Sequence, residues 1–359
     1  MTYDWRERLM LKYSDTYRTV TSRLLLALLV VSVLFLSTGC GLFGTKRKVT
    51  VPQLLTPLSE AGRDRLFQEV NRLSTVKSIH GKVDIQFEDT SFASTGVADR
   101  YRLVDGTLTL QRPGKIFLQI QFILVDIAQM ASDGEQFRVA VLQGNDKYKR
   151  FVKGTNSAVY PKLPEEPTPT GTAKEKTEKE TVSALSNLRP QHLTDAFMIR
   201  PIETNGSMIY AQSEFFQEEP DTRRQAKKDS RIMRGYYLLD EISQPSPGEA
   251  RLMRRFWFDR VGGIRLARVQ SYDDRGSLIT DVSYSDERPL GSGTTASRMP
   301  SRVEITRPQD QYKLSITYQD SSSVELNREY GPKAFVLENK WKLPEVDLDA
   351  QNKKVTANQ

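Results

Sequence analysis

The 359-residue sequence has a single cysteine, Cys40, and only two histidines, His80 and His192. One cysteine cannot close an intrachain disulfide, and these three residues are too few for a zinc site built from cysteine and histidine ligands. A hydrolase with a catalytic histidine would have to use His80 or His192, and neither has a nucleophile at a known motif spacing. We therefore expect no catalytic activity, no cofactor and no metal.

Long apolar runs are equally scarce. The only one covers residues 24–36, in which Ser32 is the single polar residue. Such a helix would span about 20 Å, less than the roughly 30 Å of a bilayer core. Arg18 and Arg23 precede the run and small residues follow at 37–39, which is the layout of a secretory signal peptide. The sequence therefore predicts a leader of residues 1–39, starting at Met1 or at Met10.

Residues 37–40 read Ser-Thr-Gly-Cys. This motif resembles the lipobox of bacterial lipoprotein precursors, with Ser37 at the position where leucine is commonest. The resemblance implies cleavage before Cys40 and acylation of its thiol and new amino terminus by fatty acids such as palmitate. Several acyl chains anchor a protein far more firmly than one. The alternative is an uncleaved signal anchor whose cysteine is incidental.

The residues after the cysteine bear on localisation and partners. Gly41 stands where aspartate would retain a Gram-negative lipoprotein in the inner membrane, so the resemblance implies the outer membrane and a periplasmic orientation. Residues 40–57 are basic and loop-like, which predicts a lipidated tether whose charges are solvated or touch anionic head groups. The leader holds five basic and three acidic residues, so its removal lowers the net charge from +7 to +5. This mild excess gives no indication of nucleic-acid binding.

Beyond the tether, the sequence predicts one helix followed by many short strands. Residues 58–75 place Leu66, Val70 and Leu73 on one helical face. About eleven apolar-polar alternations follow at hairpin spacing, without a helical period between most of them. The expected fold class is α+β and mainly β, with a large curved antiparallel sheet covered by the first helix and by short helices such as residues 193–198.

Two segments do not fit this pattern. Residues 161–183 contain four prolines followed by alternating charges, which predicts a flexible insertion because such a segment cannot bury apolar surface. Residues 345–359 are polar, and we expect them to form a disordered tail. The predicted domain therefore covers residues 58–344.

Several short motifs follow one another between Leu66 and Phe137. A helix ending in LSTVKSIH at residues 73–80 leads into a strand, and Gly-Thr-Leu at 106–108, LQRPGK at 110–115 and Ser-Asp-Gly at 132–134 come next. Their order resembles that of the bacterial lipoprotein carrier and acceptor superfamily, the LolA/LolB proteins. The resemblance implies an unclosed β-barrel whose concave face is covered by helices around an apolar cavity for acyl chains. An anchored chain is closer to the acceptor than to the soluble carrier.

The candidate ligand-binding positions lie on two of the predicted strands. By resemblance, Arg112 matches an arginine that helps to hold the helical lid shut in the carriers. The other interpretation is a strand-end arginine that faces solvent. The apolar faces of the two strands either line the cavity or fill a solid core, and the residues concerned are Leu108, Leu110, Ile116, Leu118, Ile120 and Phe122.

Two functions follow from these patterns. The leading hypothesis is an outer-membrane lipoprotein that binds acyl chains of lipids or lipoproteins in an apolar cavity and acts in their transport or localisation. The second hypothesis is a structural or assembly lipoprotein that binds an envelope protein through its sheet edges and charged loops. Catalysis finds no support, because the paired carboxylates at 165–166 and 273–274 lie in linker and turn sequence.

Overall fold

The computed structural model divides the chain into two units, residues 1–51 and 52–359. The leader, Cys40 and the 161–183 insertion lie outside the described residues, except for Leu28. No helix in the described part is long and apolar enough to cross a membrane. The residues that the structure describes are 28, 51–90, 99–100, 103–122, 125–143, 146, 149–158, 160, 188–204, 206, 208–293 and 296–357.

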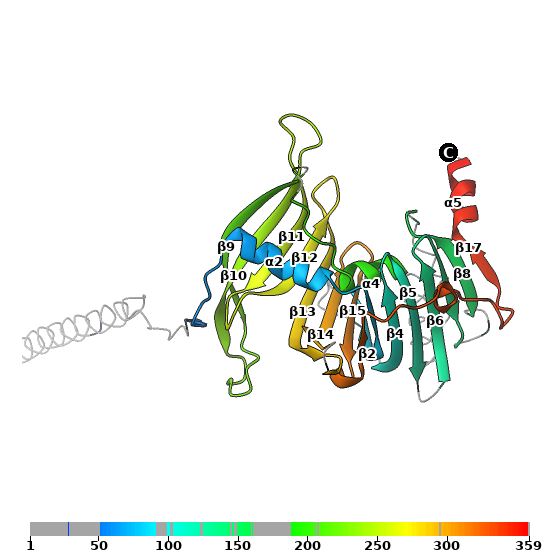
Figure 1. Cartoon of the computed structure of the whole chain (residues 1–359), viewed down its shortest axis with the longest axis horizontal. Helices are drawn as coiled ribbons and strands as arrows, with labels where there is room; N and C mark the ends of the chain where they lie inside the picture. The colour runs from blue at the N-terminus through cyan, green and yellow to red at the C-terminus, as the bar shows by residue number, and fades with distance from the viewer. Residues whose placement is uncertain are drawn as a thin grey trace, which may run out of the picture. The chain divides into compact units, whose positions relative to one another are not determined.

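The second unit is built on one curved sheet of 17 strands (Figure 1). The strands are β1 (Gln53–Leu54), β2 (Ser78–Asp89), β3 (Asp99–Arg100), β4 (Val104–Gln111), β5 (Lys115–Phe122), β6 (Val125–Asp133), β7 (Gln136–Val141), β8 (Arg150–Thr155), β9 (Met208–Pro220), β10 (Arg231–Ser243), β11 (Arg251–Asp259), β12 (Arg265–Tyr272), β13 (Leu278–Leu290), β14 (Ser297–Arg307), β15 (Tyr312–Tyr318), β16 (Glu325–Leu326) and β17 (Glu345–Asp347).

The order of these strands in space differs from their order in the sequence. Strands β9 to β15 follow one another as antiparallel neighbours, and β15 then pairs with β2. From β2 the sheet continues through β4, β5, β6, β7 and β8, and it ends at β17. The end strands β9 and β17 are not paired with each other, so the predicted unclosed, curved sheet is confirmed.

Strand β2 joins the early and late parts of the chain. Its Val83 is opposite Tyr318 of β15 on one side and opposite Gly106 of β4 on the other. A side chain at position 106 would place its Cβ atom 2.6 Å from Ile85 Cδ1 and 3.0 Å from the Gln119 carbonyl oxygen. Position 106 of β4 therefore requires glycine, because Ile85 and the Gln119 carbonyl leave no space for a side chain.

The structure corrects some details of the expected sheet. The short strands β1 and β17 pair in parallel with β10 and β8, so the sheet is mixed rather than wholly antiparallel. Residues 345–357, for which we expected disorder, form β17 and helix α5 (Leu348–Ala357). They are ordered because Val346 and Leu348 pack against the main core.

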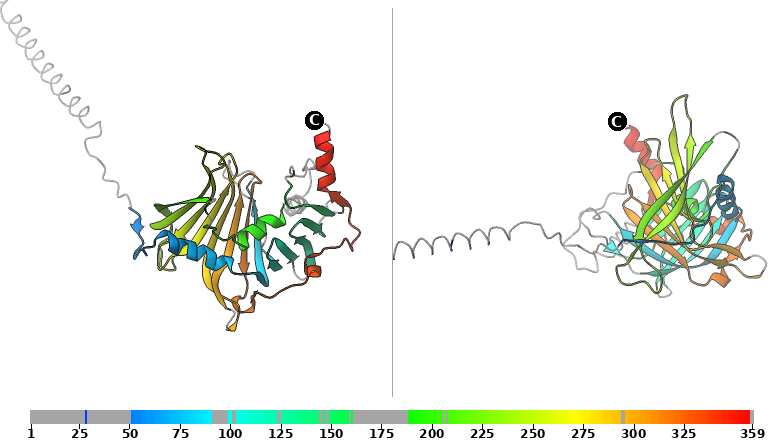
Figure 2. Two further views of the ribbon diagram at one scale, coloured as in Figure 1. Left: turned by 45° about the horizontal axis from the view of Figure 1, so that its top comes forward. Right: turned by 90° about the vertical axis from the view of Figure 1, so that its left-hand side faces the viewer.

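Two helices lie across one face of the sheet, α2 (Arg63–Ser74) and α4 (Pro190–Phe197) (Figures 1 and 2). The apolar stripe predicted for α2 is confirmed, since Leu66, Val70 and Leu73 are all buried. The helix begins later than predicted because the chain before it is extended: Leu58 forms a β-bridge with Val261. We expected a helix at 193–198, and α4 covers most of that segment.

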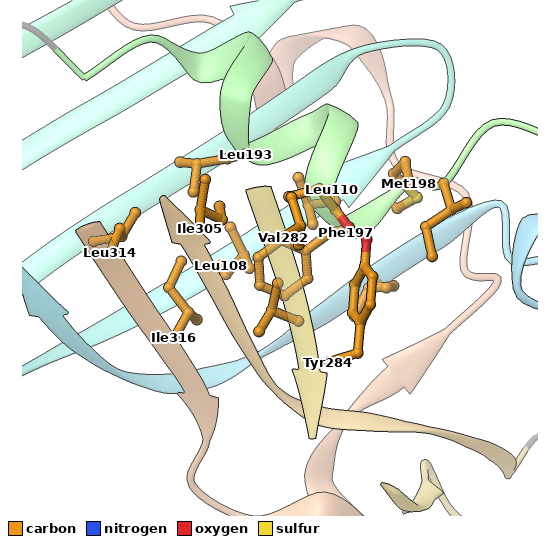
Figure 3. Close-up of a cluster of buried hydrophobic side chains, with 14 of the residues drawn as sticks. Leu108, Leu110, Leu193, Phe197, Met198, Val282, Tyr284, Ile305, Leu314 and Ile316 are labelled. Atoms are coloured by element: carbon orange, nitrogen blue, oxygen red, sulfur yellow. Dashed lines mark hydrogen bonds between the residues drawn. The ribbon is translucent and has the colours of Figure 1, made fainter. Parts of the chain in front are cut away.

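The main core lies between these helices and the sheet. It contains apolar side chains from α2 and α4 and from the inward face of most strands. Figure 3 shows its part under α4, where Leu193 and Phe197 meet side chains from β4, β13, β14 and β15. A smaller cluster on the opposite face joins Leu337 to Ala131, Ala140 and Phe151. The C-terminal segment thus covers part of the outer face of the sheet.

Candidate functional site

Arg112 connects the β4–β5 hairpin to the carboxyl end of α4. Its Nη1 donates to the carbonyl of Met198 at 3.1 Å, and its Nη2 donates to that of Ile199 at 2.9 Å. Its Nε donates to the carbonyl of Val76, just after α2, at 2.8 Å. Burial lowers the pKa of Arg112. One guanidinium therefore satisfies three backbone carbonyls that would otherwise lack partners at the ends of two helices.

The apolar candidates beside Arg112 lie in the core in this arrangement. Leu108, Leu110, Ile116 and Leu118 are 0% exposed and Ile120 is 4% exposed. Leu193, Phe197 and Met198 of the α4 segment cover this face, so its side chains meet protein rather than empty space. Phe122, at the end of β5, is half-buried. None of these six residues lines either of the two cavities described next.

The larger of the two cavities has a volume of about 550 Å³ and lies beside α4. Its walls come from α4 and the segments on either side of it, from strands β9 to β14, and from β7 and the end of β8. About half of the lining is apolar, contributed by Phe137, Ala196, Ile199, Met253, Val269 and Val282 among others. The volume is within the range of about 300–1,000 Å³ that small-molecule sites occupy.

A buried ion pair lies in the wall of this cavity. Arg254 Nε and Nη2 donate to the two carboxylate oxygens of Glu241 at 2.9 and 2.5 Å. Tyr210 donates its hydroxyl to the same carboxylate at 3.2 Å, and burial raises the pKa of Tyr210 to about 12. The guanidinium of Arg254 also donates to the carbonyl of Arg200. The pair thus fixes β10, β11 and the chain after α4 against one another.

Further charged groups face the same space. Arg307 donates to Asp310 at 2.7 Å and to the hydroxyl of Thr280 at 2.6 Å. The Nδ1 atom of His192 lies 2.7 Å from the hydroxyl of Tyr312. Burial, together with the nearby Arg307, lowers the pKa of His192 well below its usual range. This imidazole is therefore neutral at ordinary pH.

Asp195 supplies the remaining carboxylate of the cavity. Burial raises its pKa, and the positive charges of Arg200 and Arg307 partly offset that effect. The cavity is thus an amphipathic site, with apolar walls and fixed charges of both signs.

The second cavity is smaller, about 350 Å³, and lies beside α2. Its lining is dominated by ion pairs, such as Arg72 with Glu287 at 3.2 Å and Arg234 with Asp259 at 2.8 Å. Most of its charges are already paired with one another, although the Oε2 atom of Glu287 is buried without a hydrogen-bond partner. No group of three or more potential metal ligands occurs among the described side chains.

Sequence reasoning did not identify the charged residues of the larger cavity. A signal was present, because Arg254 alternates in phase with Phe256 and Phe258, and Glu241 with Tyr237 and Leu239. A charge at an inward position of a strand has to find a buried partner. The positions of Arg254 and Glu241 on the inward faces of their strands could have identified both residues as unusual. The sequence could not have shown that they pair with each other.

No protein-family model matches the sequence, and no curated protein is similar to it at a significant level. Several solved structures are similar, among them the following three. A LolA superfamily protein from Nitrosomonas europaea is 12% identical with a TM-score of 0.36, covering 77% of this chain and 99% of that one. A DUF1329 family protein from Desulfovibrio piger is 10% identical with a TM-score of 0.36, covering 76% and 95%. A domain from Vibrio parahaemolyticus named for outer membrane lipoprotein sorting is 13% identical with a TM-score of 0.31, covering 78% and 97%.

Proposed function

We propose that this protein is an envelope lipoprotein, anchored at the outer membrane through Cys40, that binds acyl chains of lipids or lipoproteins beside and beneath α4. The 550 Å³ cavity holds the first part of the acyl chain. Movement of α4 then opens the apolar face of β4 and β5 to the rest. No bond is made or broken. Transfer of hydrocarbon out of water drives binding, at about 0.8 kcal/mol per buried CH₂ group.

The observation that carries this proposal is the way in which α4 is held. The helix has only eight residues, it lies over a fully apolar strand face, and it borders the cavity. Its polar attachments to the sheet include the hydrogen bonds from Arg112 to the Met198 and Ile199 carbonyls and the bond from the Tyr284 hydroxyl to Ala196. The contact between His192 of α4 and the Tyr312 hydroxyl of β15 adds to these bonds. None of them is a strand-pairing bond, so this short helix can move without unpairing any strand.

The test measures binding of a fluorescent fatty acid to the full chain in phosphatidylcholine nanodiscs, with empty nanodiscs as the blank. Ser271 lines the larger cavity and Ser283 lines the smaller one, on the adjacent strands β12 and β13. Because an indole fills the space that the acyl chain needs, Ser271→Trp should weaken binding at least about fivefold. Ser283→Trp should leave it unchanged. Absence of binding to the unmodified chain, or equal effects of the two variants, would contradict the proposal.

A second candidate function is envelope assembly through the edge strand β9. This 13-residue strand pairs with β10, and no strand among the described residues pairs with its other edge. Ile209, Phe215 and Phe216 on it are 46%, 40% and 44% exposed. Edge strands with exposed apolar residues readily accept a strand from another protein. An envelope protein that co-purifies with the chain and is lost in Phe216→Lys, without bound lipid, would favour this function.

A further inference from the structure

Arg189 differs from the other arginines of the larger cavity. It directly precedes α4, and its guanidinium lies over the rings of Phe137 and Tyr160, at 5.3 and 5.1 Å from their centroids. Its Nη1 atom is buried and has no hydrogen-bond partner. Burial lowers the pKa of Arg189, although an arginine side chain remains protonated in proteins. A buried cationic N–H group is therefore left unsatisfied.

The other charges of the cavity do not neutralise it. Glu241 is bound to Arg254, and Asp310 is bound to Arg307. No ion pair joins Arg189 to a carboxylate among the described residues. The lining contains four arginines and three carboxylates, so the site retains an excess positive charge.

We propose that Arg189 forms an oxyanion subsite that binds the phosphate or carboxylate head of the amphiphile whose chain occupies the cavity, a step that rests on the proposed function. The planar guanidinium matches the geometry of phosphate and carboxylate oxygens. Cation–π contacts with the rings of Phe137 and Tyr160 hold the guanidinium in place before the ligand arrives. Asp310, whose Oδ2 atom accepts from Arg307, forms no ion pair with Arg189.

A purely structural role would look different. An arginine kept only for packing on two aromatic rings would have its N–H groups satisfied by carbonyls, as Arg112 has. Buried polar groups in folded proteins rarely lack partners, and each exception calls for a physical explanation. Arg189 lines a cavity large enough to hold that ligand, and its unsatisfied Nη1 is buried beside it.

The experiment compares three probes on the full chain in phosphatidylcholine nanodiscs: decyl phosphate, decanol and inorganic phosphate. Calorimetry on the unmodified chain should show decyl phosphate binding about tenfold more tightly than decanol, since the two share the chain and differ in the charged head. Inorganic phosphate should bind far more weakly than decyl phosphate if the anion comes from an amphiphile. If inorganic phosphate bound as tightly as decyl phosphate, the ligand of the oxyanion subsite would be a free anion. The proposal that an amphiphile supplies the anion would then be overturned.

Variants test the residue itself. Arg189→Met keeps the apolar stem and should remove the preference for decyl phosphate over decanol, while Arg189→Lys should keep part of it. The control is Arg328→Met, because Arg328 also stacks on a tyrosine, Tyr330, but at an exposed position outside the cavity. Equal binding of decyl phosphate and decanol to the unmodified chain would overturn the subsite and leave the acyl-chain site intact. Absence of binding by every probe would overturn both.

Discussion

The Nη1 atom of Arg112 donates a 3.1 Å hydrogen bond to the carbonyl of Met198, the residue that follows the last turn of α4. The two residues are 86 positions apart in the sequence. The last carbonyls of a helix have no partner within it, and a cation placed there also interacts favourably with the helix dipole. This contact therefore helps to hold the end of α4 against the sheet.

Replacing Arg112 by methionine should loosen α4. The carbonyls of Met198 and Ile199 would lose charge-assisted donors, which should lower the free energy of unfolding by about 2 kcal/mol. Amide hydrogen exchange in residues 191–198 should accelerate more than exchange in β2. Arg224→Met, at an exposed position between β9 and β10, is the control and should change neither quantity. Unchanged exchange in α4 would show that Arg112 does not hold the helix.

The core beneath α4 makes a separate prediction. Leu118 is completely buried and is opposite Leu108 on one neighbouring strand and Met130 on the other. Leu118→Ala should cost about 3 kcal/mol, because it leaves a cavity in close-packed surroundings. Val125→Ala, at a position that is 50% exposed, should cost far less. Urea unfolding measures both, and a small loss for Leu118→Ala would mean that its surroundings are not tightly packed in the resting protein.

The strands with one buried face could be predicted from the sequence. In β15, Tyr312, Leu314, Ile316 and Tyr318 are at most 3% exposed, while the residues between them are more exposed or polar. Strand β6 was missed because small and polar residues occupy it and its apolar alternation is weak. The apolar residues at 335–337 also predict a short closing strand, and this prediction is wrong, since residues Pro332–Phe335 form a 3₁₀ helix. A pattern of three apolar residues can suit either structure.

The site was predictable only in part. The resemblance singled out Arg112, and its guanidinium lies at the end of α4, but its part in closing a lid stays a prediction. The charged cavity depends on contacts between residues far apart in the sequence, such as Arg189 with Phe137. No local periodicity reports such contacts. A strand face that fills the core and a strand face that lines a binding site have the same apolar pattern in the sequence. Whether α4 covers the face determines which of the two it is.

Removing one partner of the buried pair between Glu241 and Arg254 should destabilise the protein more than removing one partner of the neighbouring pair. Glu241→Gln leaves the guanidinium of Arg254 buried without a counter-charge, which should cost about 3 kcal/mol or more. The adjacent pair, Asp240 with Arg255, joins the same two strands but points to the other face, with side chains 20% and 31% exposed. Asp240→Asn should therefore cost less than about 1 kcal/mol. Equal losses for the two variants would contradict this assignment.

Histidine protonation should make the protein less stable in mild acid. Burial, with Arg307 and Arg189 adding to it, lowers the pKa of His192 well below the usual 6.5. The unfolded chain therefore binds a proton more readily than the folded one once the pH falls below about 6.5. The stabilisation is complete above that pH and decreases by up to about 1.4 kcal/mol for each pH unit below it.

The same cavity contains a group, Asp195, whose effect on stability changes with pH in the opposite direction. Burial raises the pKa of Asp195, so its contribution to stability increases as the pH falls. Only a comparison of variants isolates His192. Urea unfolding from about pH 7 to about pH 5 should show a loss of stability that is absent in His192→Gln and retained in Tyr312→Phe, which removes the 2.7 Å hydrogen bond but keeps the imidazole buried. If His192→Gln kept the full loss of stability, the prediction would be wrong. Another group would then take up the proton on unfolding, and the pKa of the imidazole would be alike in the folded and unfolded chains.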